Sequence, residues 1–168
     1  NINARSESIY EKKTFRDSFK YRRCIIPING FYEWRVEEKE KIPFLVSDMN
    51  KDYMALAGIW DEYFDSELNM SIVTVALITC DANEKLGEIH HRMPVVLDKK
   101  DFNTWLHCDD IKKVNELFVI YPNEKLKLYE VRSEVNKVVF DEASCIDEVI
   151  SKKEEESEPK EIGQLSLF

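Results

Sequence analysis

Short stretches in which apolar and polar residues alternate dominate this chain, and this pattern predicts strands rather than long helices. The two strongest strand predictions are residues 53–60 and 70–79, which are rich in β-branched and aromatic residues. The polar segment 61–69 separates them, so we expect the two strands to form a hairpin. Shorter strands are predicted at residues 44–47, 95–97, 126–131 and 135–140.

Helical spacing of apolar residues occurs in a few short segments. Residues 8–19 predict a helix that turns Ile9, Phe15 and Phe19 inward. One helical turn capped by Asp81 is expected over residues 81–88. Two more helices, each opened by an aspartate, are predicted at residues 101–106 and 110–120. Short helices mixed with mainly antiparallel strands indicate an α+β fold.

A carboxylate among aromatic residues is the first candidate for chemistry. The apolar run 24–28 meets the turn signal Asn29-Gly30, and a second run around Glu33 follows, so we predict a hairpin. Rings on both sides of a carboxyl group exclude water and raise its pKa, which prepares it to transfer protons near neutral pH. An exposed Glu33 paired with an arginine is the alternative. Strand alternation gives the second run two faces, with Phe31, Glu33 and Arg35 on one and Tyr32 and Trp34 on the other.

The second candidate is the histidine pair His90-His91, which lies just before Pro94. Adjacent histidines on an extended segment point to opposite faces, and no HExxH or Cys/His set accompanies them, so we expect no metal site. No cofactor-binding motif is present either. One histidine could act as a general acid or base, because an unperturbed imidazole has a pKa of about 6.5. A hydrogen-bonded structural histidine is the alternative.

Length and composition predict one domain, residues 1–150, followed by a disordered acidic tail, residues 151–168. The 168 residues are 43% apolar, which suffices for one core, and no apolar run reaches the roughly 20 residues that a membrane span needs. The tail is charged and nearly free of apolar residues before its last few positions, so burial cannot compensate for its ordering entropy. Four cysteines without CxxC spacing favour reduced thiols and therefore a cytoplasmic protein. We also expect the protein to be a monomer.

The net charge of −9 argues against a nucleic-acid partner only if it is spread evenly. Residues 141–168 carry nine acidic and three basic side chains, a net charge of −6. Residues 1–23 carry seven basic and three acidic side chains, a net charge of +4. A basic face near the amino terminus is therefore compatible with the acidic total, and a solvated amphipathic helix is the alternative.

Five separately spaced blocks resemble the SRAP domain family, the SOS response-associated peptidase-like proteins. The blocks occur over residues 1 to about 140 and are Asn3-Ala4-Arg5-Ser6-Glu7, Arg22-Arg23-Cys24-Ile25-Ile26-Pro27 with Gly30-Phe31-Tyr32-Glu33-Trp34, Ala57-Gly58-Ile59-Trp60, Thr79-Cys80-Asp81-Ala82-Asn83 and Ile89-His90-His91-Arg92-Met93-Pro94. The resemblance implies an SRAP-like fold. It also implies binding to single-stranded DNA at abasic sites, and a covalent crosslink through a cysteine exposed once the initiator methionine is removed.

The resemblance assigns Asn3, Glu33 and His90 to the active site and Arg5 to DNA contact, and we add Trp34 and Arg92 as DNA-binding candidates. An abasic aldehyde can condense with an amino-terminal amine as a Schiff base, and a thiol on the same residue can close a thiazolidine. Glu33 would move protons on and off the amine and carbinol, and His90 would protonate the sugar oxygen or the departing hydroxyl. Asn3 would hold the amino-terminal cysteine.

This chain departs from the family pattern because it has no amino-terminal Met-Cys. We expect it to be a fragment whose parent protein supplies the crosslinking cysteine, so that the fragment alone is inactive. A degenerate relative that binds DNA without reacting is the alternative. Two other functions stay open: a peptidase that processes itself or other proteins, and a noncatalytic adaptor at the replication fork.

The last five residues form a separate candidate for partner binding. Gln164-Leu165-Ser166-Leu167-Phe168 closely resembles the short motif by which bacterial replication and repair proteins bind the sliding clamp. Leu165, Leu167 and Phe168 would fill apolar pockets, while the Gln164 amide would satisfy polar groups at the rim. A tether of about a dozen residues would let the motif reach a clamp without disturbing the domain. Association with the bacterial nucleoid follows as an expectation.

Overall fold

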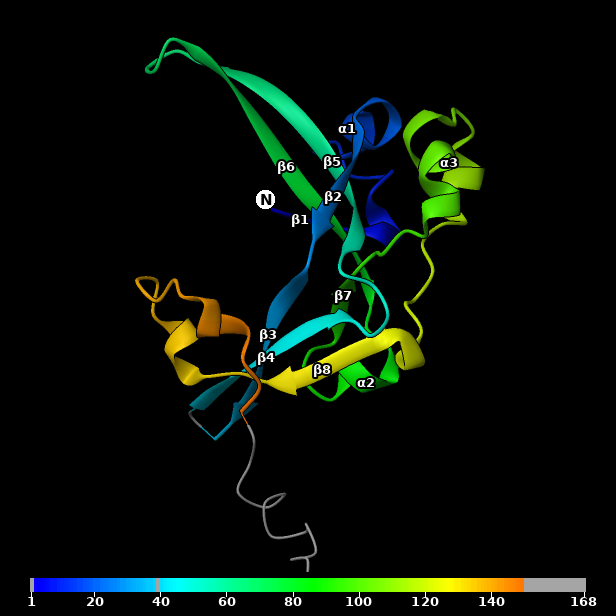
Figure 1. Cartoon of the computed structure of the whole chain (residues 1–168). Coiled ribbons are helices and arrows are strands. Elements are labelled where there is room, and N and C mark those ends of the chain that lie inside the picture. The colour runs from blue at the N-terminus through cyan, green and yellow to red at the C-terminus, as the bar shows by residue number, and fades with distance from the viewer. Residues whose placement is uncertain (1, 39, 150–168) are drawn as a thin grey trace, which may run out of the picture.

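The chain folds into two β-sheets with short helices around them, as the computed structural model shows for residues 2–38 and 40–149 (Figure 1). We call them the large sheet and the small sheet. The large sheet has the order β1 (Asn3–Arg5), β6 (Met70–Asp81), β5 (Met54–Asp65) and β2 (Arg23–Ile28), and β7 (Arg92–Pro94) also pairs with β6. The small sheet has the order β3 (Gly30–Glu37), β4 (Glu40–Asp48) and β8 (Leu126–Glu130). The predicted tether and terminal motif lie outside the described residues.

The ladders confirm the predicted α+β fold with mainly antiparallel strands. Among the described residues only β1 and β6 pair in parallel, with Asn3 opposite Leu77. The predicted β5–β6 hairpin is confirmed, and its strands extend through Asp65 and Met70. Asn69 takes the left-handed φ of 51° at its turn, a conformation that asparagine tolerates better than most residues. Figure 1 shows this hairpin extending beyond the rest of the molecule.

The predicted hairpin at Asn29-Gly30 is wrong. The chain passes from β2 in the large sheet through Asn29 directly into β3 in the small sheet. A type I′ turn needs positive φ at both central residues, and none of the described glycines has a positive φ. Gly30 is required for a different reason: a Cβ at this position would lie 2.7 Å from the Val46 carbonyl oxygen. The glycine thus permits close approach of β4 and makes no turn.

Three of the four helices are shorter than predicted, the helix predicted at residues 101–106 keeps its length one residue later, and the inward residues of the first helix are correct. Ile9, Phe15 and Phe19 are buried, and Phe19 packs near the buried Trp105 with ring centroids 6.2 Å apart. The predicted cap of the short helix after β6 was wrong by two residues, since Asn83 accepts the Leu86 N–H at 2.9 Å. The α-helices are α1 (Arg16–Tyr21), α2 (Glu84–Gly87), α3 (Phe102–His107) and α4 (Ile111–Asn115), and the 3₁₀ turns are η1 (Ser6–Ser8), η2 (Lys99–Asp101), η3 (Asn123–Lys125), η4 (Ser133–Asn136) and η5 (Ala143–Ile146).

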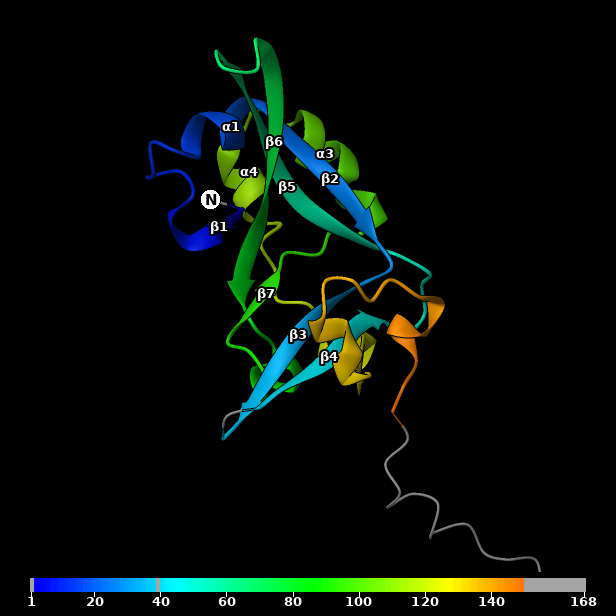
Figure 2. The same cartoon turned by 90° about the vertical axis from the view of Figure 1, so that its left-hand side faces the viewer.

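Residues 135–140, predicted as a strand, form no strand. The first two of them end the 3₁₀ turn η4, and Val138 is fully exposed. We call residues 131–149 the covering segment, because it lies against the outer face of the small sheet (Figure 2). Asn136 holds this segment by accepting the Trp34 indole N–H at 2.6 Å and donating to the Lys41 carbonyl at 3.2 Å. Side-chain hydrogen bonds replace the strand ladder that β-branched composition had predicted.

Arg23 explains one part of the basic amino-terminal charge. Its guanidinium donates to the carbonyl oxygens of Phe19 at 2.8 Å and Cys108 at 2.7 Å, which lie at the ends of α1 and α3. The charge therefore caps two helices and is not part of an open basic face. No helix within the described residues is long and apolar enough to cross a membrane.

Candidate active site

A cavity of about 420 Å³ lies where β1, β6 and β7 of the large sheet meet the start of β3. Its walls include all three residues of the predicted active-site set, Asn3, Glu33 and His90, together with Arg5 and Arg92. These five residues come from three segments far apart in the sequence. The fold therefore assembles the residues that the resemblance to a family had singled out.

Glu33 reaches the cavity because β3 presents alternate side chains to it. The side chain is 22% exposed and lies opposite Phe44 in the β3–β4 ladder. Burial raises the pKa of the Glu33 carboxyl above its usual range, and the nearby His90 imidazole partly offsets this. Glu33 thus meets the expectation of a partly desolvated acid. It is the carboxylate that the small sheet contributes to the cavity wall.

His90 faces Glu33 across the cavity, with 3.6 Å between its Nδ1 and the carboxylate Oε1. The same Nδ1 lies 3.0 Å from the Arg92 carbonyl oxygen and 3.3 Å from the Arg92 N–H. The carbonyl is closer than the N–H, and the carboxylate also favours a proton on Nδ1. We assign the neutral imidazole a protonated Nδ1 that donates to the Arg92 carbonyl; in this tautomer the Arg92 N–H cannot donate to Nδ1, and Nε2 is the acceptor of the ring.

Asn3 and Arg5 are alternate residues of β1, so both side chains lie on one face while Ala4 between them is buried. Both are exposed and line the cavity. The parallel pairing of Asn3 with Leu77 and of Arg5 with Thr79 fixes their positions along β6. An amide and a guanidinium therefore stand side by side at the rim, where a polar substrate would enter.

Arg92 is the residue whose surroundings differ most from the prediction. Its guanidinium donates to both Glu7 carboxylate oxygens at 2.7 and 3.0 Å, to Asp81 at 2.6 Å and to the Thr79 carbonyl at 2.7 Å. The side chain is only 13% exposed. Hydrogen bonding to this guanidinium lowers the pKa of Glu7. Arg92 lies at the cavity as predicted, but two carboxylates and a backbone carbonyl already accept from its two terminal nitrogens, and its buried Nε has no hydrogen-bond partner among the described residues.

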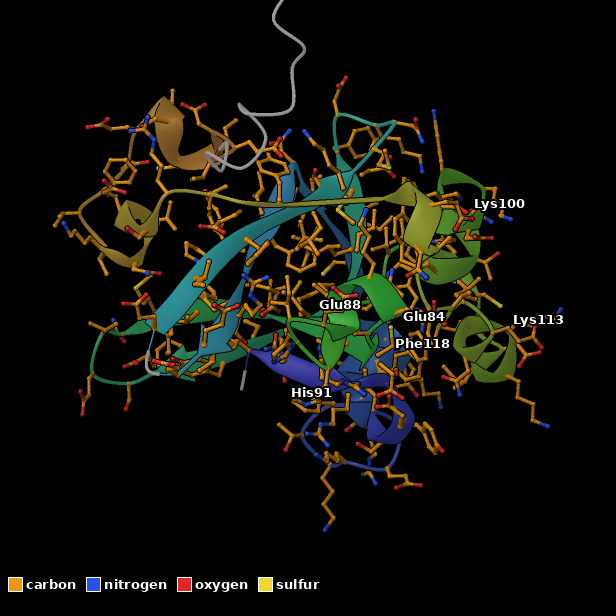
Figure 3. All side chains as sticks on the ribbon, turned by 90° about the horizontal axis from the view of Figure 1, so that it is seen from below. Glu84, Glu88, His91, Lys100, Lys113 and Phe118 are labelled. Carbon is orange, nitrogen blue, oxygen red and sulfur yellow. The ribbon has the colours of Figure 1, made fainter. Side chains whose placement is uncertain are left out.

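The structure does not bring Trp34 to the cavity. Strand alternation turns it to the opposite face of β3, where it packs against Tyr32 and donates its N–H to Asn136. Sequence reasoning did not assign the other residues of the cavity wall to the site; these are Phe31, Tyr32, Leu77, Thr79, His91, Met93 and Pro94. Figure 3 shows His91 on the segment between α2 and β7, beside β1. The signal for Phe31 was available, because it shares a face with Glu33 in the strand pattern.

None of the four cysteines lines this cavity. Cys80 is buried behind it, and burial raises the pKa of its thiol to about 11. Burial also raises the pKa of the half-buried Cys24. A thiol with a raised pKa is a poor nucleophile at neutral pH. The cavity offers an acid, an imidazole, an amide and a guanidinium, which suit proton transfer and substrate positioning.

Within residues 2–38 and 40–149, no cluster of three or more histidine, cysteine, aspartate or glutamate residues could hold a metal ion. The cavity itself contains one carboxylate and two histidines, and the rings of His90 and His91 lie 4.7 Å apart between centroids. Glu33 and His90 therefore form an acid–base pair, a pair that can move protons to and from a carbonyl or an amine.

Comparison with known proteins places this cavity in a family. The family model described as SOS response associated peptidase (SRAP) matches residues 1–138. The abasic site processing protein YobE of Bacillus subtilis is 36% identical over 138 residues, covering 80% of this chain and 63% of YobE. The abasic site processing protein HMCES of Gallus gallus is 27% identical over 164 residues, covering 86% of this chain and 49% of HMCES.

Solved structures agree with this relationship. A protein from Bacteroides thetaiotaomicron has a TM-score of 0.82 at 29% identity, covering 88% of this chain and 66% of that one. A protein from Bordetella bronchiseptica has a TM-score of 0.70 at 25% identity, covering 77% and 64%. The chain spans less than two thirds of YobE and of both structures. The match over residues 1–138 covers the cavity and both sheets, and the chain belongs to the SRAP family.

Proposed function

We propose that this domain acts on single-stranded DNA at abasic sites, and that the protein containing it forms a covalent thiazolidine with the lesion through an amino-terminal cysteine outside the 168 residues. The observation that carries the proposal is the Glu33–His90 pair, 3.6 Å apart in a cavity bordered by Asn3 and Arg5. Relatives named abasic site processing proteins supply the substrate class.

The reaction needs proton transfers and no redox partner. The α-amine adds to the C1′ aldehyde of the opened sugar, and loss of water from the carbinolamine gives the imine. The thiolate of the same residue then adds to the imine carbon, and the nitrogen takes up a proton to complete the thiazolidine. Each step gains or loses a proton at nitrogen or oxygen, so two groups of intermediate proton affinity suffice.

We assign the roles by position. Glu33, partly desolvated, accepts a proton from the attacking amine and returns one to the carbinol oxygen that leaves as water. His90, whose Nε2 is the acceptor in the tautomer assigned above, exchanges a proton with the sugar oxygen. The Asn3 amide orients the cysteine, and Arg5 holds an adjacent phosphate. Trp34 lies on the far face of β3, so the proposal gives it no stacking role at the cavity.

The test combines the full-length protein with a single-stranded oligonucleotide that contains one abasic site. We expect an adduct that survives denaturing electrophoresis, and no adduct with a tetrahydrofuran analogue, which has no aldehyde. Cysteine-to-serine substitution at the amino terminus is the matched control, because serine keeps the amine but gives no thiazolidine. Wild-type protein that leaves every abasic oligonucleotide unmodified would refute the crosslinking function.

Peptidase activity is a second candidate, since the matching family model carries that word in its description. The cavity wall contains no serine and no cysteine, so hydrolysis there would need water activated by Glu33 or His90. A panel of fluorogenic peptides separates the two functions. Peptide cleavage that is lost in Glu33→Gln, without any DNA adduct in the wild type, would favour the peptidase over the crosslinking function.

We also propose that Gln164, Leu165, Leu167 and Phe168 bind the bacterial sliding clamp and so hold the domain near replication forks in the nucleoid. A peptide covering residues 158–168 should bind purified clamp in the micromolar range, roughly −8 kcal/mol. Double substitution of Leu167 and Phe168 by alanine should remove most of that affinity. Calorimetry without binding at several hundred micromolar would refute this partner. A clamp interaction without any DNA adduct would favour the noncatalytic adaptor.

A further inference from the structure

Acceptors from two segments of the chain hold the Arg92 guanidinium. Glu7 belongs to η1 after β1, while Asp81 and the Thr79 carbonyl belong to the last three residues of β6. Glu7 binds through both carboxylate oxygens, the two-pronged geometry that makes a guanidinium–carboxylate pair directional. The first residue of β7 is therefore anchored to the loop that follows β1.

The backbone of the same arginine holds the imidazole of His90. The Arg92 carbonyl lies 3.0 Å from Nδ1 and its N–H lies 3.3 Å from it. Because the side chain and the backbone belong to one residue, a shift of the guanidinium moves the groups that set the proton on Nδ1. Figure 3 shows the short connection from α2 to β7 on which the histidine pair lies.

We propose that Glu7 is a positioning residue for His90: its carboxylate, with Asp81, fixes the Arg92 guanidinium on β6 and so keeps the backbone of Arg92 in contact with the imidazole. Glu7 does not touch the reacting atoms in this role. It keeps Nε2 of His90 available to substrate by keeping the proton on Nδ1. The inference deepens the proposed function and rests on it only in its kinetic part.

The competing interpretation makes Arg92 a direct ligand of a DNA phosphate. A phosphate would then have to displace Glu7, whose two hydrogen bonds occupy two guanidinium nitrogens. The two interpretations predict opposite signs for Glu7→Gln. If Glu7 competes with phosphate, its neutralisation strengthens DNA binding. If Glu7 positions His90, its neutralisation leaves binding nearly unchanged and slows the chemistry.

The first experiment uses the 168-residue chain labelled with ¹⁵N and needs no activity. Imidazole ¹⁵N chemical shifts at a pH where histidine is neutral report which nitrogen carries the proton. In the wild type we expect the Nδ1–H form of His90 to dominate, and in Glu7→Gln a mixture with a substantial Nε2–H population. His107, at the end of α3, is an internal reference that should stay unchanged.

Glu88→Gln is the matched control. Glu88 is exposed two residues before His90, so its substitution removes a nearby negative charge without touching Arg92. An equal tautomer change in both variants would show a general electrostatic effect and overturn the proposal, as would an unchanged tautomer in Glu7→Gln. If Glu7→Gln fails to fold, Asp81→Asn removes the more exposed carboxylate and should give a smaller change of the same kind.

The second experiment uses the full-length protein and separates rate from affinity. Glu7→Gln should slow adduct formation about 10- to 100-fold, the size expected when a reacting group is slightly misplaced. Affinity for the unreactive tetrahydrofuran oligonucleotide should change less than about twofold. Tighter binding with an unchanged rate would make Arg92 a phosphate ligand and refute the positioning role. If the wild type forms no adduct, the proposed function fails, and the tautomer measurement still decides the role of Glu7.

Discussion

The two faces of β3 each carry aromatic residues and make different contacts. One face carries Phe31 and Glu33 to the cavity, and the Glu33 carboxyl group is partly buried 3.6 Å from His90 Nδ1. The other face carries Trp34, and Tyr32 at the cavity border, to the covering segment, where the Tyr32 hydroxyl donates to the Cys145 carbonyl at 3.1 Å and the Trp34 indole donates to Asn136 at 2.6 Å. The polar side chains of the covered face are hydrogen-bonded within the protein, whereas the Glu33 carboxyl group on the cavity face is available to a substrate.

This difference shows that one face of β3 contributes to the stability of the fold, while the other face contributes to the cavity. Hydrogen bonds on the covered face lower the free energy of the folded state, because partly exposed polar groups there gain partners within the protein. On the cavity face, burial raises the pKa of Glu33, which means that partial desolvation of its charged form destabilises the folded state. Substitutions on the two faces should therefore change different measurements, and the following predictions test this in order of decreasing effect.

Glu33→Gln should have the largest effect, and on rate. Removing a positioned acid or base costs typically about 10²–10⁴ in rate, so adduct formation by the full-length protein should slow by that order. Single-turnover kinetics with an abasic oligonucleotide measure this, with Trp34→Phe on the opposite face as the control that keeps the wild-type rate. Unchanged kinetics in folded Glu33→Gln protein would remove Glu33 from the mechanism.

Asn136→Ala should have the next largest effect, and on stability. The substitution removes the hydrogen bonds to Trp34 and to the Lys41 carbonyl, so we expect the free energy of unfolding to fall by about 1–2 kcal/mol. Urea titration followed by tryptophan fluorescence measures it. Adduct kinetics should match the wild type under conditions where both proteins are folded. A rate loss at full folding would show that the covered face also controls the cavity.

Tyr32→Phe tests the same face with a smaller change. It deletes one hydroxyl and its hydrogen bond to the Cys145 carbonyl, which should cost about 0.5–1.5 kcal/mol of unfolding free energy. Thermal melting at matched pH gives the difference. A destabilisation larger than that of Asn136→Ala would place the anchor of the covering segment at η5 instead of η4.

The smallest effect should be a pH-dependent gain of stability in Glu33→Gln. Burial raises the pKa of Glu33 above 4.5, so the folded state holds its proton more tightly than the unfolded state. The wild type therefore has its full stability below pH 4.5 and loses part of it as pH rises through the folded pKa. Glutamine cannot ionise, so urea midpoints of the two proteins should coincide in acid and the variant should exceed the wild type above the folded pKa. A variant less stable at neutral pH would contradict the assigned cause of the shift.

Local patterns predicted the site better than they predicted the connections. Alternation placed Glu33 and Trp34 on opposite faces of β3, and the structure confirms this. Asn29-Gly30 carries the strongest short-range hairpin signal in the chain, yet its glycine is needed for the close approach of Val46. A glycine required by a distant strand and a glycine required by a turn look identical in the sequence.

Contacts between distant segments were beyond sequence reasoning. The bidentate pair of Glu7 and Arg92 joins residues 85 positions apart, and no rule of local spacing pairs them. The β-branched residues Val138 and Val139 suggested a strand, but both are exposed because hydrogen bonds from Asn136 hold this region in another way. The family blocks identified Asn3, Glu33 and His90 as a set, and only the fold shows which atoms face one another.

The pairing of β1 with β6 has a consequence for synthesis of the protein. Asn3 in β1 lies beside Leu77 in β6, so β1 leaves the ribosome long before β6, the strand with which it pairs. Contacts between residues so far apart in the sequence form slowly, because the entropy cost of closing the intervening loop must be overcome first. Asn3 and Arg5 therefore stay apart from His90 until the segments that lead to β7 have been synthesised. A nascent chain that stops before β7 has no assembled cavity.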